Sequence, residues 1–332
     1  MKKHKNILDR RLCVAPMMDW TDRHCRFFLR LLAPDAWLFT EMVTAEALIY
    51  GDLDRLLGHS AAESPLVLQL GGSKPDRLAR AVARAAPWGF AEINLNVGCP
   101  SDRVQSGKFG ACLMAEPELV ATCCRAMMDE TDLPITVKCR IGINDMDAET
   151  GLDRFVETLA NAGVSIFYLH ARKAWLTGLS PKQNRTIPPL DYDRVRRLAK
   201  RRSDLSVILN GGLETADQAI SEMHGCDGVM IGRAAYRTPY MLTEIGQRIF
   251  GRVPLRHDHV ALAMAEYADT MTKNGVPLHS ITRHMLGLYA GQPGAKYWRR
   301  QLGENARMAT APGDFILEIS TFCEALAARH AA

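Results

Sequence analysis

Short apolar runs alternate with amphipathic helical stretches along the first 240 residues. Most of these runs are continuously apolar at their centre, as expected for strands that are buried on both faces. Eight strand–helix alternations over this length predict an α/β fold, a (β/α)8 TIM barrel. The eight runs are Leu12–Met17, Trp37–Thr40, Leu66–Leu70, Ala91–Asn96, Ile135–Arg140, Ser165–His170, Leu205–Asn210 and Gly228–Ile231.

The alternative fold is a doubly wound open sheet, but no G-x-G-x-x-G follows the first run. Helices are predicted over Thr21–Leu32 and Lys74–Arg84, and Thr215 with Gln218 three residues later has the pattern of a helix cap. Residues 241–332 show helical periodicity and no convincing strand run. We therefore predict two domains, a catalytic barrel over residues 1–240 and an all-helical domain over residues 241–332.

The composition is that of a soluble globular protein, with 47% hydrophobic and 23% charged residues among 332. No apolar run approaches the roughly 18 residues that span a bilayer, and the charged N-terminus has no apolar core of a signal peptide behind it. Nine cysteines without a C-x-x-C pair argue against a disulfide framework or a zinc site. We expect a cytoplasmic protein without a metal or a membrane anchor.

Positive charge is concentrated in one segment. Residues 172–202 hold ten Lys/Arg against two acids, whereas the formal net charge of the whole chain is +4. Such a segment is a candidate surface for binding a polyanion. A solvated basic helix face explains the same pattern, and charge alone does not separate the two.

Polar residues gather where the predicted strands end, and in a barrel of this type the active site forms at those carboxyl ends. Each of these side chains costs free energy to bury without a partner, so their presence at one level predicts a functional site. The residues are Glu41, Gln69, Asn96, Cys99, Lys138, Arg140, His170, Arg172 and Asn210.

The last two strand ends are rich in glycine. Asn210–Gly212 and Gly232–Arg233 follow the seventh and eighth runs, where such barrels often bind phosphate. Glycine lets backbone N–H groups approach phosphate oxygens, and Arg233 can hold them bidentately; ordinary turn glycines are the alternative. Lys138 and His170 would place positive charge in the barrel mouth, where it could stabilise an electron-rich cofactor such as a reduced flavin.

Cys99 differs in context from the other cysteines. Pro100 disfavours helical geometry at Cys99, so the thiol is expected on an extended loop over the barrel mouth. Cysteine thiols ordinarily have a pKa of about 8.5 and are mostly protonated at neutral pH, which suits a general acid. The remaining cysteines are interpreted as structural residues.

Five strings together resemble the tRNA-dihydrouridine synthase family over the full length of the chain. The strings are Ala15–Asp22, Asn94–Ser101, Val137–Arg140, His170–Arg172 and Asn210–Gly212. Further strings, Asp19–Arg23, Gly142–Asp145 and Gly291–Gly294, resemble the A subfamily, which acts on uridines 20 and 20a of the tRNA D-loop.

The resemblance implies a chemistry and a set of residues. NADPH would reduce a tightly held FMN, the flavin N5 would deliver hydride to C6 of the uracil, and Cys99 would protonate C5. Asn96 matches the asparagine that binds the uracil, and Lys182, Arg185, Arg299 and Arg300 match tRNA-contacting regions. The implied FMN contacts are Pro16, Met17, Met18, Gln69, Lys138, His170, Asn210, Gly211, Gly212, Gly232 and Arg233.

The helical domain would then bind tRNA, and the protein is expected to be a monomer. Lys296–Arg300 combines cations with aromatic rings, as an RNA-binding surface requires, although Trp298 itself is expected to be buried. Two other functions stay open at this point. One is an FMN barrel acting on a free small molecule, as dihydroorotate-type dehydrogenases do, and the other is a tRNA-binding or folding factor that has lost catalysis.

Overall fold

Eight parallel strands form a barrel in the computed structural model, which describes residues 9–331. The charged N-terminus, for which no signal peptide is expected, lies outside the described residues over positions 1–8. Each strand pairs with the next in chain order from β2 to β8, and β8 pairs with β1. The strands are β1 (Leu12–Val14), β2 (Leu38–Thr44), β3 (Leu66–Gly71), β4 (Glu92–Val97), β5 (Ile135–Arg140), β6 (Ile166–His170), β7 (Ser206–Asn210) and β8 (Gly228–Ile231).

The barrel closes between its first two strands. A parallel bridge joins Cys13 of β1 to Trp37, the residue before β2. Two backbone hydrogen bonds support it, from the Val14 N–H to the Trp37 carbonyl at 2.8 Å and from the Trp37 N–H to the Leu12 carbonyl at 2.9 Å. The predicted (β/α)8 barrel is therefore confirmed, and an open sheet is excluded.

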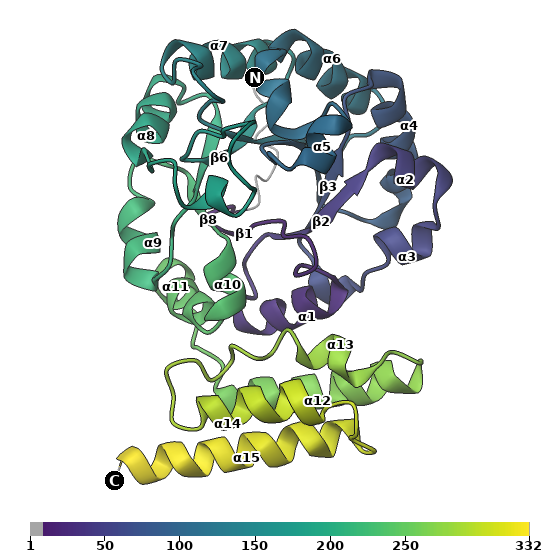
Figure 1. Cartoon of the computed structure of the whole chain (residues 1–332), viewed down its shortest axis with the longest axis vertical. Coiled ribbons are helices and arrows are strands. Elements are labelled where there is room, and N and C mark those ends of the chain that lie inside the picture. Colours follow the sequence, from purple (N-terminus) through teal and green to yellow (C-terminus); the bar gives the residue numbers. More distant parts are fainter. Residues whose placement is uncertain (1–8, 332) are drawn as a thin grey trace. The chain divides into compact units, whose positions relative to one another are not determined.

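Helices surround the strands and continue after them. In Figure 1, α4, α6, α7, α8 and α9 lie in the outer ring of the barrel, whereas the short α5 lies inside that ring. The helices are α1 (Arg23–Leu32), α2 (Ala45–Tyr50), α3 (Leu53–Leu57), α4 (Pro75–Ala85), α5 (Asp102–Ser106), α6 (Pro117–Met128), α7 (Thr150–Asn161), α8 (Tyr192–Arg201), α9 (Ala216–Glu222), α10 (Arg233–Arg237), α11 (Met241–Phe250), α12 (His257–Lys273), α13 (Leu278–Thr282), α14 (Ala295–Arg300) and α15 (Pro312–Ala331).

Two strands end more than one residue away from the sequence-based expectation. β1 ends at Val14 rather than Met17, so Pro16 to Met18 lie in the loop that follows it. β2 continues to Thr44 through a register shift between Phe39 and Met42. Glu41 therefore lies inside β2 and not at its end, and the expectation for this residue was wrong. The apolar run ended at Thr40, and nothing in the sequence marked a bulged continuation.

The interior of the barrel has an apolar layer. Buried side chains of six strands, together with Ala15 and Trp37, pack into one cluster, in which the rings of Phe39 and Tyr168 meet edge to face at 5.0 Å. Fully buried apolar side chains contribute most of the favourable free energy of folding. The cluster comprises Cys13, Ala15, Trp37, Phe39, Val67, Ile166, Tyr168, Ile208 and Met230.

The chain divides into two compact units. The first comprises residues 1–18 and 36–232, and the second comprises residues 19–35 and 233–332. The second unit thus contains α1 and α10 together with the C-terminal helices, whereas the sequence predicted a boundary after residue 240. The boundary between a catalytic domain and a tRNA-binding domain after residue 240 stays a prediction.

The second unit is held together by contacts far apart in sequence. Asp22 caps α1 and accepts hydrogen bonds from Arg283 at 2.7 Å and His284 at 2.9 Å. Burial alone would raise the pKa of Asp22, but these hydrogen bonds hold it well below its usual range. Tyr267 of α12 stacks on Phe27 of α1, with ring centroids 4.1 Å apart. α1 therefore belongs to the helical unit by packing.

Candidate active site

The predicted polar residues lie at the carboxyl ends of neighbouring strands. In the register of the barrel, Asn96 of β4 pairs with Lys138 of β5, and His170 of β6 pairs with Asn210 of β7. Gln69 lies on β3, which neighbours β4. The structure thus brings five of the predicted site residues to one end of the barrel.

Lys138 is a cation whose side chain is hydrogen-bonded to a neutral amide. Its Nζ donates to Asn210 Oδ1 at 3.0 Å, and Asn210 Nδ2 in turn donates to the Met230 carbonyl at 2.7 Å. Burial, with a further contribution from Arg140, lowers the pKa of Lys138 from 10.5 to about 8. Within the described chain no carboxylate lies at ion-pair distance from it, so an anionic ligand would find its charge uncompensated.

Arg140 is a second cation, which is buried and joins two loops. Its Nε donates to the Gly98 carbonyl at 3.2 Å, and its Nη1 donates to the carbonyls of Lys173 at 3.1 Å and Asn184 at 2.8 Å. Burial lowers the pKa of Arg140 to about 10. The sequence placed this residue at a strand end but gave it no role in the site; the K-x-R spacing with Lys138 was the available signal.

A buried carboxylate on β4 starts a chain of directed hydrogen bonds. Glu92 accepts from Arg10 Nε at 2.9 Å and Nη2 at 2.7 Å, from Tyr168 at 3.0 Å and from the Thr136 hydroxyl at 2.7 Å. Burial raises the pKa of Glu92, and the Arg10 guanidinium opposes that rise. Four donated hydrogen bonds suit an ionised carboxylate, which can only accept. Because Thr136 donates to Glu92, its oxygen is left to accept from Asn94 Nδ2 at 2.8 Å.

The chain of hydrogen bonds continues with the same donor-to-acceptor order up to the loop that carries Cys99. Asn94 Oδ1 accepts from Gln69 Nε2 at 2.8 Å, and Gln69 Oε1 accepts from Asn96 Nδ2 at 2.8 Å. Asn96 Oδ1 accepts from the backbone N–H groups of Gly98 at 3.1 Å and Cys99 at 3.0 Å. Asn96 therefore keeps one Nδ2 hydrogen for a ligand and can present a donor but no acceptor. Sequence reasoning found Gln69 and Asn96 but missed Glu92, Asn94 and Thr136.

Cys99 lies on the loop between β4 and α5, as predicted, and it is half-buried. Its carbonyl accepts from the Ala111 N–H at 2.9 Å, and its Sγ lies 3.5 Å from Ser101 Oγ. Gly110, at φ +75°, allows this close approach, because a Cβ there would lie 2.5 Å from the Cys99 carbonyl oxygen. The loop is thus fixed at both sides of the thiol.

The glycine-rich strand ends differ in the space beside their backbone, because the side chains of His170 and Leu190 lie against Gly211 and Gly212. Gly211 and Gly212 have φ of +118° and +67°, which strongly favours glycine. A Cβ on Gly232 would meet no atom within 4 Å, so there is space beside that backbone. Arg233 follows directly and opens α10. In the loop after β1, the Met18 side chain is 58% exposed.

The predicted tRNA contacts fall on exposed positions. Lys182 and Arg185 lie on the long loop between β6 and α8, and Arg299 and Arg300 end α14 in the second unit. The arginines of α8 are different, because they bind acids of neighbouring helices. Arg194 and Arg201 pair with Asp153 at 2.5 and 2.7 Å, Arg197 pairs with Glu149, and Arg196 pairs with Glu222. For α8 the structure favours an ion-paired helix face over a polyanion surface.

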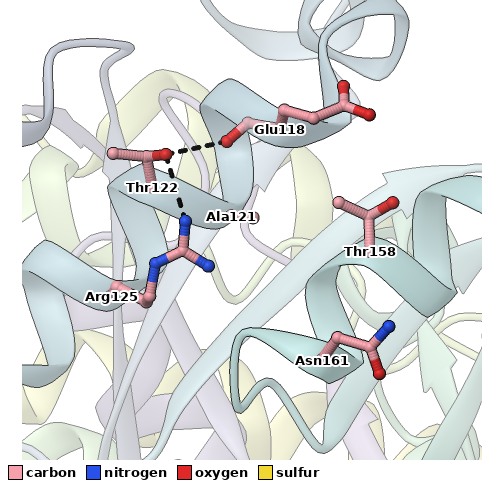
Figure 2. A pocket seen from close by; sticks show the side chains of 6 residues that line it. All are labelled: Glu118, Ala121, Thr122, Arg125, Thr158 and Asn161. Atoms are coloured by element: carbon pink, nitrogen blue, oxygen red, sulfur yellow. Dashed lines mark hydrogen bonds between the residues drawn. The ribbon is translucent and has the colours of Figure 1, made fainter.

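A surface hollow of about 370 Å³ lies elsewhere on the molecule. Figure 2 shows it between α6 and α7, lined by Glu118, Thr122 and Arg125 of α6 and by Thr158 and Asn161 of α7. Arg125 donates to Thr122 Oγ1 at 3.3 Å. The lining of this hollow contains none of the predicted site residues. Among residues 9–331, no cluster of three metal-ligating side chains and no helix able to cross a membrane is found.

Comparisons with known proteins agree over nearly the whole chain. The family model described as dihydrouridine synthase (Dus) matches residues 13–326. The tRNA-dihydrouridine(20/20a) synthase of Xanthomonas campestris is 49% identical over 322 residues, which cover 97% of this chain and 96% of that protein. The Escherichia coli protein of the same name is 51% identical over 304 residues, which cover 91% and 88%.

A solved structure supports the fold. An old yellow enzyme homologue from Zymomonas mobilis superimposes with a TM-score of 0.52 and 14% identity, over 74% of this chain and 90% of that one. At this identity the likeness concerns the barrel architecture alone.

Proposed function

The chain belongs to the dihydrouridine synthase family, and from this we propose that it reduces the C5=C6 bond of D-loop uridines 20 and 20a in tRNA to 5,6-dihydrouridine. The observation that carries the proposal is the directed chain from Glu92 to Asn96, which ends at the backbone of Cys99. It sets a hydrogen-bond donor beside a loop-borne thiol at the barrel mouth. Free small-molecule reduction and loss of catalysis gain no support from the relatives.

The residues at the mouth fit FMN as the cofactor. A half-buried Lys138 without a carboxylate partner in the described chain would receive an electron-rich ring, and the open space at Gly232 would admit a phosphate close to the backbone. Gln69, His170, Asn210, Gly211, Gly212 and Arg233, with Pro16, Met17 and Met18, would complete the binding site. Bound FMN, reduced by NADPH, would supply hydride to C6 of the uracil.

Cys99 would supply the proton. A half-buried thiol fixed over the mouth can donate to C5 of a uracil held beneath it. Asn96 orients the base, because its remaining Nδ2 hydrogen pairs with a carbonyl oxygen of uracil. The amino group that cytosine carries in place of one carbonyl would face this donor unfavourably. The hydrogen-bond chain that ends at Asn96 thereby favours uracil over cytosine.

Binding tRNA requires surfaces beyond the mouth. A uridine in a folded tRNA must be turned out of its stack, which costs a few kcal/mol. Phosphate contacts by Lys182, Arg185, Arg299 and Arg300 would offset this cost. We expect the enzyme to act as a monomer in the cytoplasm, where its tRNA substrate is found.

The function is tested with unmodified tRNA. The purified protein, FMN, NADPH and a tRNA transcript are incubated, and the nucleotides at positions 20 and 20a are analysed by mass spectrometry. We expect a gain of two hydrogen atoms at these uridines and at no other. A protein that oxidises NADPH without this gain would refute the proposed function.

A further inference from the structure

Trp175 is an exposed tryptophan on the β6–α8 loop (residues 171–191). All five tryptophans of the chain lie among the described residues, and Trp175 is the exposed one, at 38%. The indole N–H groups of Trp37 and Trp298 donate to backbone carbonyls at 3.0 and 2.8 Å. Within residues 9–331, the Trp175 indole has neither a hydrogen bond nor a stacked ring.

The backbone of Trp175 is nevertheless firmly fixed. The side chain of the fully buried Asn184 accepts from the Trp175 N–H at 2.8 Å and donates to the Trp175 carbonyl at 2.8 Å. One buried amide thus holds both backbone groups of this residue. An exposed loop residue held in this way loses little further conformational entropy when it binds a ligand.

The neighbours of Trp175 are tied to the loop that follows β5. Two backbone hydrogen bonds join them to it, with the Ala174 N–H donating to the Gly142 carbonyl at 3.0 Å and the Asn144 N–H donating to the Ala174 carbonyl at 2.8 Å. The Leu176 N–H donates to Asn144 Oδ1 at 2.9 Å. Every residue from 174 to 176 therefore has its backbone bound to another part of the chain.

Two side chains connect this loop to the Cys99 loop. Gln105 of α5 donates through Nε2 to the carbonyls of both Pro100 and Leu176, each at 2.9 Å. Arg140 donates to the carbonyls of both Gly98 and Lys173. The residues flanking Cys99 and those flanking Trp175 thus share hydrogen-bond donors, which fixes the backbone of Trp175 relative to that of Cys99.

We propose that Trp175 is a stacking platform for a nucleobase of the tRNA next to the target uridine, an inference that rests on the proposed function. Once a uridine is turned out toward Cys99, its neighbours are unstacked on that side and need a new partner. An exposed indole fixed to the same loop system offers one, since base–aromatic stacking accepts any base. The platform would keep the strand open while the uridine reacts.

The charge of the loop favours RNA over an apolar protein partner. Lys182 and Arg185 are exposed on the same loop, and their cations suit the phosphates of the strand whose base stacks on the indole. Aromatic rings combined with cations are typical of surfaces that bind single-stranded nucleic acid. A protein partner for Trp175 is the competing explanation, and it predicts no effect of Trp175 on tRNA binding.

The first experiment compares Trp175→Ala with Trp175→Phe. The Kd for unmodified tRNA is measured by fluorescence anisotropy, with Trp88→Ala as a control from the turn that precedes β4. We expect Trp175→Ala to weaken binding about 5- to 150-fold and Trp175→Phe to retain most of the affinity. Equal FMN binding by all variants would show that the barrel is intact. An unchanged Kd for Trp175→Ala would overturn the proposal.

The second experiment identifies the stacked base. Transcripts with a single abasic site at each nucleotide flanking uridines 20 and 20a are bound to the wild-type protein and to Trp175→Ala. We expect the effect of Trp175→Ala to disappear for one of these transcripts, as in a double-mutant cycle. An equal effect of Trp175→Ala on every transcript would contradict stacking. Binding is measured without NADPH, so a wild-type protein that binds but forms no dihydrouridine refutes the proposed function and not the platform.

Discussion

Lys138 illustrates how a single residue would couple the binding of an anionic cofactor to pH. Its pKa is lowered to about 8, by burial first and by Arg140 second, so the free protein loses this cation as the pH rises through about 8. An anionic ligand in the mouth favours the protonated form and raises that pKa. Binding therefore takes up a proton above pH 8.

The predicted consequence is a pH-dependent affinity for FMN. The Kd should be nearly constant below pH 8 and should rise above it, by at most about tenfold per pH unit. Fluorescence titration of the apoprotein with FMN between pH 6 and pH 10 measures this. Lys138→Met should bind FMN more weakly and with no such dependence. An equal rise of the Kd above pH 8 in Lys138→Met would show that another group titrates.

Thr136 is predicted to position the site without touching the substrate. Thr136→Val keeps the shape but leaves Asn94 Nδ2 without its acceptor, so the amides of Asn94 and Gln69 can turn and the hold on Asn96 weakens. We expect flavin reduction by NADPH to be unchanged and its reoxidation by tRNA to fall about 10- to 100-fold. Thr136→Ser, which keeps the hydroxyl, should restore the rate. A Ser variant as slow as the Val variant would indicate a packing role instead.

At the scale of elements, the eight strands were predictable because each is a short apolar run buried on both faces. The continuation of β2 past Thr40 was not, because Thr40 and Glu41 interrupt the apolar run where the register shifts between Phe39 and Met42. The polar residues at the strand ends were predictable as well, because each of them stands at the end of an apolar run. The hydrogen-bond chain that runs from Glu92 through Thr136 was not predictable. Its members are ordinary strand residues, and only the register between neighbouring strands brings them within hydrogen-bond distance.

The basic segment shows why charge counts mislead when the ion pairs are unknown. Arg194, Arg197 and Arg201 of α8 are paired with Glu149 and Asp153 around α7, so their charge is largely compensated. Those acids lie some 40 to 50 residues earlier in the chain. Only the fold reveals that the arginines of α8 are paired with acids, whereas Lys182 and Arg185 lie exposed on the loop before α8.

This division predicts different salt dependences for tRNA binding. Lys182→Ala with Arg185→Ala should weaken binding and lower the slope of log K against log salt by about one for each phosphate that the variant no longer binds. Arg201→Ala should leave both unchanged, because its guanidinium is already bound to Asp153. Titrations at several salt concentrations measure the slopes. A lower slope for Arg201→Ala would restore α8 as part of the RNA surface.

At the scale of the molecule, the second unit is expected to contribute to tRNA binding and little to flavin binding. Arg299 and Arg300 are exposed, whereas the preceding Trp298 is fully buried, as the sequence predicted. Arg299→Ala with Arg300→Ala should weaken tRNA binding and flatten its salt dependence while the FMN Kd stays the same. A wild-type salt slope would show that these arginines do not contact phosphate.

The inclusion of α1 in the second unit could not be foreseen from sequence, because the contacts of Asp22 and Phe27 join residues more than 200 positions apart. The periodicity of residues 21–32 is the same for a barrel helix and for a helix of another unit. Resemblance to the family located the candidate residues, and the geometry shows how the Asn96 amide and the Cys99 loop are held together.

The most direct test of this account follows Cys99→Ala through two half-reactions. Reduction of bound FMN by NADPH and its reoxidation by tRNA are measured separately by stopped-flow absorbance. If Cys99 is the proton donor, reduction proceeds at the wild-type rate, because it needs no proton for C5, and reoxidation falls by about 10²- to 10⁴-fold. Reoxidation of the variant by tRNA at the wild-type rate would contradict the role of Cys99 and the mechanism built on it.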